Sequence, residues 1–332
     1  MRNSFLLVAL LLLAVAWQGD AAALRGASSP LYIALGDSLA FGVGASDPGQ
    51  TGYVSLVFNA LQTEPASPYK ESGLTLLNLG DPGETTTSML ASGGQLENAL
   101  TEIESRRDDG IAGNEVVVIT IAIGANDFIP LAQSGSPCLT APLSNACQKA
   151  ARSALATFRS NFGDIMRRLR SATGPEVEII VLDLYNPLSG AVGPFDSVGD
   201  LVVQQFNSTV ASAAREPDIQ AKVADIFRLF QGKGPQLTHI AEWPPDVHPN
   251  DSGHYLMARA VVTALGLPAD AVATPPSAMP TATPTVRALP ATGDNGDADT
   301  PWALYIGLIV AGVVVVATGL LVVARRRAAS GR

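Results

Sequence analysis

Residues 31–39 have the sequence Leu-Tyr-Ile-Ala-Leu-Gly-Asp-Ser-Leu, an apolar run that ends in a glycine, an acid and a hydroxyl. A short apolar run bounded by Gly and polar residues is typical of a buried β-strand that ends in a loop. In open α/β sheets, functional sites lie outside the carboxyl ends of the strands. The hydroxyl of Ser38 therefore stands where chemistry is expected. A capping role at the start of a helix is the alternative for this serine.

Further apolar runs follow along the chain and alternate with segments of helical character. The expected strands are Leu31–Leu35, Leu74–Leu79, Val116–Ile123, Val177–Leu184 and Val223–Ile226. The expected helices are Tyr53–Gln62, Gln95–Arg106, Cys147–Ser171, Asp200–Arg215 and Asp251–Leu265. This alternation predicts an α/β domain with a mainly parallel sheet that helices cover on both faces.

Two further segments could supply hydrogen-bond donors where strands are expected to end. Gly80 follows one expected strand, and Asn126 with Asp127 follows another. The backbone N–H of Gly80 and the side-chain amide of Asn126 could donate to the oxyanion that forms when an ester carbonyl is attacked. Each has a simpler alternative, because glycines end many strands and Asn or Asp often closes its own turn.

One of the three histidines, His248, lies in the proline-rich loop 244–250, just before the last expected helix. An unperturbed imidazole accepts and returns a proton near neutral pH. Asp246 precedes it by two residues in an extended segment, so both side chains point to the same side and the carboxylate can orient the ring. A solvated surface position is the alternative for both. His254 is expected inside the following helix, and His239 has no acidic neighbour within two residues.

Taken together and in this order, these residues resemble the four sequence blocks of the SGNH, or GDSL, hydrolases. The matching segments are residues 36–39, 78–85, 124–127 and 248–250. The resemblance implies a flavodoxin-like three-layer α/β/α fold with a mainly parallel sheet, and hydrolysis of carboxylic esters through an acyl-serine intermediate. It implies Ser38 as nucleophile and His248 as base, with an oxyanion hole formed by Ser38, Gly80 and Asn126. It calls for no metal and no organic cofactor.

The last block departs from the family pattern, which usually places an acid three residues before the histidine. Pro245 occupies that position, and Asp246 stands one residue closer to His248. Either Asp246 orients His248 or a backbone carbonyl does, and we expect Asp246. The Ser38 segment also lacks the second glycine of a G-x-S-x-G elbow, which argues against the α/β-hydrolase family.

Both ends of the chain are expected to lie outside the hydrolase domain, which we place at residues 24–270. Residues 1–23 have the pattern of a secretory signal peptide. Residues 271–300 are rich in Pro, Thr and Ala, which favours an extended stalk. Residues 302–324 carry no charge, and as a helix of about 34 Å they could span a membrane. The arginines of residues 325–332 favour a cytoplasmic tail, with the body of the protein outside the cell.

The expected stalk contains a pentapeptide that resembles the L-P-x-T-G signal of sortase substrates. It consists of Leu289, Pro290, Ala291, Thr292 and Gly293, and the apolar span and the arginines follow it. The resemblance implies that a sortase cuts between Thr292 and Gly293 and joins the domain to cell-wall peptide. A chance match in front of an ordinary membrane anchor is the alternative.

The charge of the chain narrows the range of partners. The whole sequence carries −9. Because residues 1–23 are neutral and residues 301–332 hold four arginines and no acid, the segment between them carries −13. This acidic balance argues against nucleic acid or an anionic lipid surface as a partner.

The two cysteines, Cys138 and Cys147, are close together in the sequence. Outside the cell such a pair is most simply a disulfide. Without suitably spaced histidines they make a poor zinc site. We therefore predict a disulfide and no metal.

The sequence as a whole predicts a secreted, surface-tethered serine esterase or lipase whose substrate is a lipid or acylated carbohydrate ester. One alternative is a carbohydrate or peptidoglycan O-acetylesterase, which would use the same catalytic residues. Another is a cell-surface binding or adhesion module that has the fold without the reaction.

Overall fold

The computed structural model describes residues 29–141, 144–191 and 195–274. The predicted signal peptide (1–23), the LPATG motif (289–293), the apolar span (302–324) and the basic tail (325–332) lie outside these residues, as does the predicted stalk beyond residue 274. Within the described ranges, no helix has the length and apolar character needed to cross a membrane.

Five parallel strands form the central sheet in the order β2-β1-β3-β4-β5. They are β1 (Leu31–Gly36), β2 (Thr75–Asn78), β3 (Val116–Ala122), β4 (Glu178–Leu182) and β5 (Lys222–Ala224). Every predicted strand is present, with its ends shifted slightly. The apolar strands β1 and β3 lie side by side and are almost completely buried, whereas β2 and β5 form the edges.

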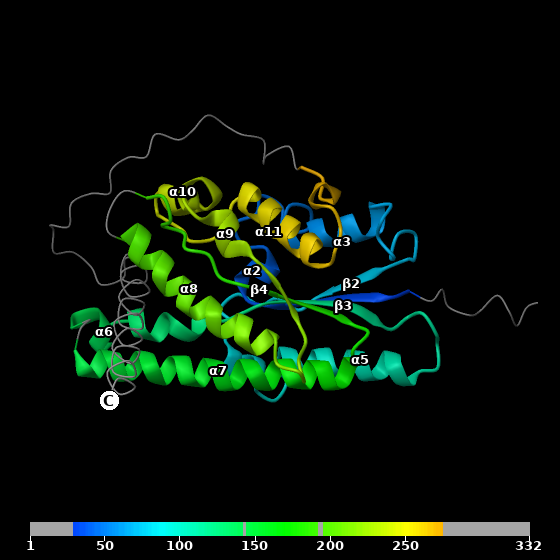
Figure 1. Ribbon diagram of the computed structural model, residues 1–332, viewed down its shortest axis with the longest axis horizontal. Helices are drawn as coiled ribbons and strands as arrows, with labels where there is room; N and C mark the ends of the chain where they lie inside the picture. The colour runs from blue at the N-terminus through cyan, green and yellow to red at the C-terminus, as the bar shows by residue number, and fades with distance from the viewer. Residues whose placement is uncertain (1–28, 142–143, 192–194, 275–332) are drawn as a thin grey trace, which may run out of the picture.

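Helices cover both faces of this sheet, so the predicted three-layer α/β fold is confirmed (Figure 1). One layer contains α3 (Tyr53–Thr63), α9 (Ile226–Phe230), α10 (Gly234–Leu237) and α11 (Asp251–Ala264). The other contains α5 (Gln95–Asp108), α7 (Asn145–Thr173) and α8 (Phe195–Ala214). Shorter helical segments are α2 (Ser38–Phe41), α4 (Thr86–Met89), η1 (Ala125–Ala132), α6 (Pro137–Thr140), η2 (His239–Ala241) and η3 (Ala269–Ala271).

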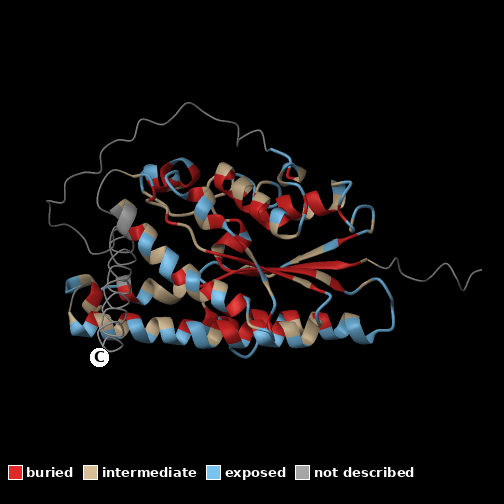
Figure 2. Ribbon diagram, viewed as in Figure 1, coloured by how far each residue is buried: buried red, intermediate tan, exposed pale blue. Residues whose placement is uncertain are grey.

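Side chains along each strand point alternately to the two faces of the sheet, and this divides the core into two clusters. Tyr32 and Ala34 of β1 pack with α3 and α11 on one face, while Ile33 and Leu35 pack with α5 and α7 on the other. Successive strand side chains point to opposite faces, so a strand that is apolar at every position must be covered on both. Figure 2 shows β1, β3 and β4 largely buried between helices that expose mainly their outer sides, whereas the edge strand β2 is partly exposed.

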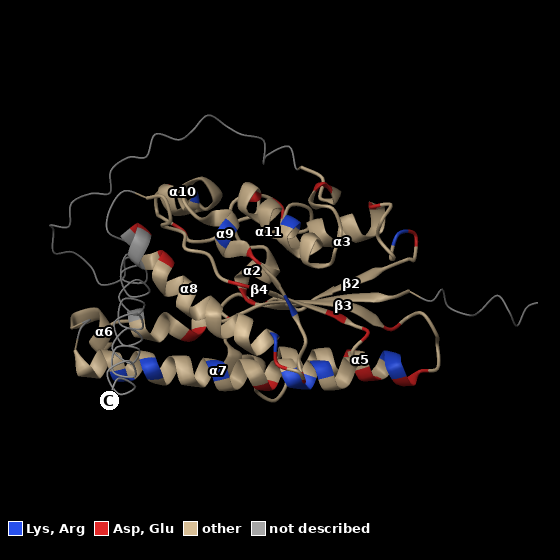
Figure 3. Ribbon diagram, in the orientation of Figure 1, with Lys and Arg blue, Asp and Glu red and all other residues tan. Residues whose placement is uncertain are grey.

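Charged residues lie almost entirely on the helices and loops (Figure 3). The charged side chains within the strands are Glu178 and Lys222, which form an ion pair of 2.9 Å between β4 and β5. The middle of the sheet is therefore uncharged, and polar groups gather at the strand ends.

The predicted disulfide is present and joins Cys138 of α6 to Cys147 in the first turn of α7. Both cysteines are fully buried, in a small cluster with Leu131 and Ala151 that is separate from the two main core clusters. The bond closes a loop beside η1, which follows β3.

Candidate active site

The turn that carries Ser38 is held firmly at the end of β1. Ser38 is the first residue of α2, and the cap of that helix is Asp37, whose carboxylate accepts the N–H of Leu39 at 3.0 Å. Ser38 is therefore not the capping residue, which leaves its hydroxyl free for another role. The side chain of Gln95 fixes the residue before the turn, since it accepts the N–H of Gly36 at 2.9 Å and donates to its carbonyl at 2.7 Å.

Ser38, His248 and Asp246 are joined by direct hydrogen bonds. The Oγ of Ser38 lies 2.9 Å from Nε2 of His248, and Nδ1 of His248 lies 2.6 Å from Oδ1 of Asp246. The bond to His248 lowers the pKa of Asp246 from its ordinary value, so the carboxylate is ionised and can only accept. The ring proton of His248 must then be on Nδ1, and Nε2 of the same ring is left to accept the Ser38 hydroxyl proton.

The carboxylate of Asp246 also fixes the loop that carries His248. Its Oδ1 accepts the backbone N–H of His248 at 3.1 Å, in addition to the ring bond. Although Asp246 is only two residues before His248, its carboxylate reaches Nδ1 of the ring. The usual family pattern assigns this contact to an acid three residues before the histidine. Pro245, at the usual acid position, lines a neighbouring hollow.

Asn126 lies in η1, directly after β3, as predicted. Its side-chain amide donates to the carbonyl of Glu84 at 2.9 Å. An amide has two N–H groups, so the second can serve another acceptor. The neighbouring Asp127 accepts the N–H of Thr86 at 3.0 Å and also its hydroxyl, so the loop after β3 is joined to the loop after β2.

Gly80 packs closely against the helix that begins at Ser38. A β-carbon at this position would lie 2.4 Å from the backbone nitrogen of Phe41 and 2.7 Å from the carbonyl carbon of Ala40, so only glycine fits. Its N–H donates to Oδ1 of Asn78 at 2.9 Å, and the Asn78 amide donates to the Ala40 carbonyl at 2.8 Å. The N–H that the family resemblance assigns to an oxyanion is therefore paired with Asn78 in this structure.

Burial dominates the electrostatics beneath the nucleophile. Asp37 is 2% exposed, and this burial raises its pKa to about 7 against the opposing effects of the Leu39 N–H and of nearby His248. Desolvation likewise raises the pKa of Asp127, although Thr86 hydrogen bonds work in the opposite direction. Within the described residues, no group of three or more His, Cys, Asp or Glu side chains is arranged to hold a metal ion.

The two histidines that sequence reasoning set aside also lie at this site. His254 is in α11, as predicted, and its fully buried ring contacts the loop after α2, with Nε2 3.0 Å from the Val43 carbonyl oxygen. His239 contacts the next residue of that loop, with Nε2 2.8 Å from the Gly44 carbonyl oxygen. His239 does have an acidic partner, Glu242, which lies three residues away and pairs with Nδ1 of its ring. The i, i+3 spacing of a helical turn was the available signal.

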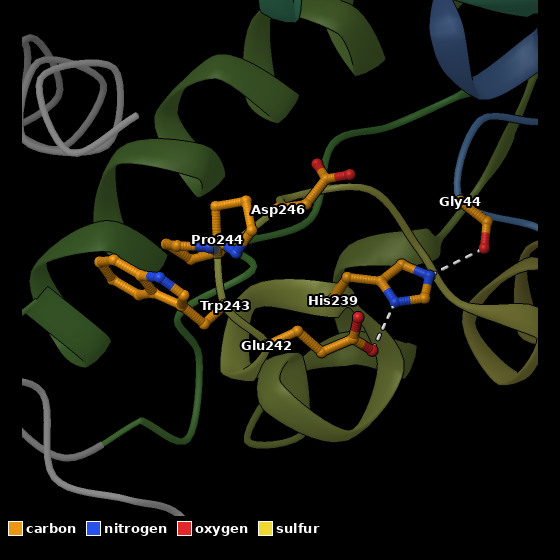
Figure 4. A pocket seen from close by; sticks show the side chains of 7 residues that line it. Gly44, His239, Glu242, Trp243, Pro244 and Asp246 are labelled. Atoms are coloured by element: carbon orange, nitrogen blue, oxygen red, sulfur yellow. Dashed lines mark hydrogen bonds and ion pairs between the residues drawn. The ribbon is translucent and has the colours of Figure 1, made fainter. Parts of the chain in front are cut away.

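Beside Asp246 lies an open hollow of about 560 Å³, shown in Figure 4. It is lined by Gly44, His239, Glu242, Trp243, Pro244, Pro245 and Asp246. Trp243 is 75% exposed and lies on one side of this hollow. A large aromatic surface is thus open to solvent three residues before the acid that orients His248.

Comparison with known proteins now assigns the family. The model of the GDSL-like lipase/acylhydrolase family matches residues 34–256, which is more than half of the chain. The chain belongs to this family. Membership makes it an ester hydrolase, and the matched range includes Ser38, Gly80, Asn126 and His248.

This GDSL-like hydrolase shares its fold with a solved lipase. It is similar to the lipase Lip_vut3 from a goat rumen metagenome, with 22% identity, coverage of 71% of this chain and 97% of that one, and a TM-score of 0.51. It is also similar to Axe2, an acetylxylan esterase from Geobacillus stearothermophilus, with 19% identity, coverage of 74% and 98%, and a TM-score of 0.45. No curated protein matches the sequence.

Proposed function

We propose that this hydrolase is a serine esterase in which Ser38 attacks the carbonyl carbon of a carboxylic ester. The observation that carries the proposal is the unbroken series of hydrogen bonds from Ser38 through His248 to Asp246. A hydroxyl is a weak nucleophile until a base accepts its proton, and the base needs an oriented ring. A binding module would have no use for this arrangement, which argues against the non-catalytic alternative.

The reaction follows from the proton positions. Nε2 of His248 accepts the Ser38 proton as Oγ bonds to the carbonyl carbon, and the imidazolium that forms is stabilised by Asp246. The same proton then passes to the leaving alkoxide as the ester C–O bond breaks, which yields the alcohol and an acyl-serine. A water molecule, deprotonated by His248, attacks the acyl carbon, and Ser38 recovers its proton as the acid leaves.

The oxyanion of each tetrahedral intermediate needs donors near Ser38. We assign the Ser38 N–H, the Gly80 N–H and the free N–H of the Asn126 amide to this role. As the first residue of α2, Ser38 has an N–H that finds no partner within its helix. To donate to the oxyanion, the Gly80 N–H has to break its hydrogen bond to Oδ1 of Asn78 or become bifurcated between the two acceptors. Each donor of this kind can be worth about 3 kcal/mol in the transition state.

A fluorophosphonate probe tests the assignment directly, because it forms a covalent bond only with an activated serine. We expect labelling of the full-length wild-type protein and none of the Ser38→Ala variant, whose kcat on p-nitrophenyl acetate should fall by about 10⁴-fold or more. Ser46→Ala is the matched control, since Ser46 lies in the next loop and bonds to Asp251 rather than to a histidine. Absence of labelling in folded wild-type protein would support the binding module instead.

Trp243 favours an acylated carbohydrate as the substrate, the second candidate function. An exposed indole can stack on a sugar ring, and the carboxylate of Glu242 in the same hollow can accept hydroxyl hydrogen bonds. We expect Trp243→Ala to raise KM for acetylated xylo-oligosaccharides while KM for p-nitrophenyl acetate stays the same. Equal effects on both substrates, or faster hydrolysis of p-nitrophenyl palmitate than of any acetylated sugar, would favour a lipid ester.

We also propose that the domain is secreted and tethered at the outer cell surface, on the basis of sequence patterns alone. The support is the signal-like segment 1–23, the LPATG motif at 289–293, the apolar span 302–324 and the arginines that follow it. Mass spectrometry of cell fractions separates the two modes of attachment. A wall-bound form that ends at Thr292 supports sortase processing, and an intact C-terminus found solely in the membrane fraction contradicts it.

A further inference from the structure

His239 lies between two hydrogen-bond acceptors, one at each ring nitrogen. Nδ1 is 2.6 Å from Oε1 of Glu242, and Nε2 is 2.8 Å from the carbonyl oxygen of Gly44, as the dashed lines of Figure 4 show. Neither a carboxylate nor a carbonyl can donate a proton. Both bonds therefore exist together only when both ring nitrogens carry protons, that is, when His239 is an imidazolium cation.

Besides a local bond from the Glu242 N–H to its carbonyl, the backbone of His239 makes two bonds to the loop that carries the catalytic histidine. Its N–H donates to the carbonyl of His248 at 3.1 Å, and its carbonyl accepts the N–H of Asp246 at 3.2 Å. The residue thus contacts the nucleophile's loop through its ring and the loop of the base through its main chain. Gly44, the residue that the ring contacts, also packs directly against His248.

We propose that His239, as a cation, is a positioning residue that holds the loop after Ser38 against the loop that carries His248 and Asp246. The inference rests on the proposed roles of Ser38 and His248 as nucleophile and base. It adds a residue outside the triad that controls their alignment. Because the ring must carry two protons to make both bonds, this control depends on pH.

The charges around His239 favour its protonated form. Burial alone would lower its pKa, but the Gly44 carbonyl and the carboxylates of Glu242 and Asp246 outweigh burial and raise its pKa above the ordinary value. The facing loop contacts the His239 ring through the neutral carbonyl of Gly44. The carboxylate of Asp47 in the same loop accepts the N–H of Gly49 and the side-chain amide of Gln50.

The remaining titratable neighbours are His248 on the adjoining loop, and Asp251 and His254 on α11. Asp251 accepts bonds from Ser46 at 2.7 Å and Thr51 at 2.8 Å, so its charge is directed to the loop after α2. Burial lowers the pKa of His254 to about 4, so this ring is neutral: Nε2 donates to Val43, and Nδ1 accepts the N–H of Tyr53. Two consecutive carbonyls of the loop after α2 thus accept hydrogen bonds from histidines of different charge: Val43 from neutral His254 and Gly44 from cationic His239.

The consequence for catalysis is a loss of alignment at alkaline pH. When His239 loses a proton, one of its two side-chain bonds is lost, and the tie between the two loops weakens. Small displacements of reacting groups lower the rate of the chemical step more than they lower substrate binding. We therefore expect kcat to fall as pH rises through the pKa of His239, with KM nearly unchanged.

The first test measures the proton itself and does not depend on hydrolysis. Imidazole ¹⁵N spectra of the full-length protein should show both nitrogens of His239 protonated at pH 6.5, while His254 remains neutral. Glu242→Gln removes the charge and keeps the shape, so the titration midpoint of His239 should move to lower pH. A neutral His239 at pH 6.5, or an unchanged midpoint in Glu242→Gln, overturns the proposal.

The second test measures kcat from pH 6 to 9 in a pH-stat with phenyl acetate. His239→Gln can still donate to Gly44 but does not titrate, so its alkaline decline should disappear. His239→Ala should lose about ten- to a hundredfold in kcat, with part of that activity restored in His239→Gln. Circular dichroism verifies that each variant is folded, and a folded His239→Ala with the wild-type profile overturns the proposal. If Ser38→Ala retains turnover, the proposed function fails, whereas the ¹⁵N titration still reports on His239.

Discussion

Gly44 lies directly against His248, with no room for a side chain between them. A β-carbon added at residue 44 would lie 3.0 Å from the Cβ of His248 and 2.3 Å from the carbonyl oxygen of Pro249. Gly44 also has a φ of +91°, a conformation that other residues rarely adopt. The loop after the nucleophile and the loop of the base therefore meet backbone to backbone, and their contact depends on this glycine.

Gly44→Ala should misalign the catalytic groups. The added methyl group has to push His248 or Pro249 away, so we expect kcat on p-nitrophenyl acetate to fall by about ten- to a hundredfold with little change in KM. Gly110→Ala is the matched control, since Gly110 has a φ of +74° and open space around it. Gly110→Ala should lose about 1 kcal/mol of stability through the same kind of backbone strain as Gly44→Ala. Its kcat should stay at the wild-type value. Equal kcat losses in the two variants would contradict the prediction.

Asp246→Asn tests whether Asp246, which is one residue closer to His248 than the acid of the usual family pattern, orients the His248 ring. The amide can present an N–H to Nδ1 of His248, which favours the tautomer that cannot accept the Ser38 proton. We expect kcat to fall by about 10³- to 10⁴-fold. Asp218→Asn, a change at an exposed loop aspartate, should leave kcat unaltered. Near-normal turnover in Asp246→Asn would mean that another group orients the ring.

Asn126→Ala removes one proposed oxyanion donor. We expect kcat to fall by about 10²- to 10³-fold with a small change in KM, because the bond forms fully only in the transition state. Asn98→Ala, at an exposed helical position, serves as the control. A loss of stability without a loss of kcat would restrict Asn126 to its structural bond with Glu84.

Asp37 should make the stability of the protein depend on pH. Burial raises its pKa to about 7, above the value of 3.8 expected for the unfolded chain, so between these values the folded state holds a proton that the unfolded state has released. The free energy of unfolding must then decrease as pH rises through this window, by up to about 1.4 kcal/mol per pH unit. Asp37→Asn, which can still cap α2, should be more stable than wild type at pH 8 by a wider margin than at pH 5.

Urea unfolding of wild type and Asp37→Asn at both pH values measures this difference. Asp183 contributes a slope of the same sign in both proteins, because its pKa is also raised to about 7 by burial. The comparison of variant with wild type therefore isolates Asp37. An equal stability difference at pH 5 and pH 8 would contradict the assigned protonation.

The Cys138–Cys147 disulfide should stabilise the fold without taking part in the reaction. The two residues are nine positions apart, and closing a loop of this size in the unfolded chain is worth about 3 kcal/mol. We expect the double variant Cys138→Ala/Cys147→Ala to lose about that much stability, with kcat unchanged under conditions where it is folded. Reduction of the wild-type protein should give the same loss, and a marked fall in kcat would implicate the bond in shaping the site.

The sequence predicted the strands, the main helices and the triad, because apolar periodicity and short motifs are local signals. It did not predict how Gly80 is used, since its bond to Asn78 and its packing against α2 arise only when β2 and β1 lie side by side. The role of His239 was hidden for the same reason. Its partner Gly44 is 195 residues away, and no local pattern joins the two.

The position of Trp243 gives this hydrolase an intrinsic optical reporter. Within the described ranges it is the only tryptophan; the other two, Trp17 and Trp302, belong to the predicted signal peptide and apolar span. Its indole is 75% exposed beside Asp246, so its fluorescence emission should be that of a water-exposed indole until a ligand covers it. A shift of that emission to shorter wavelength would report the arrival of a substrate beside the triad without any label.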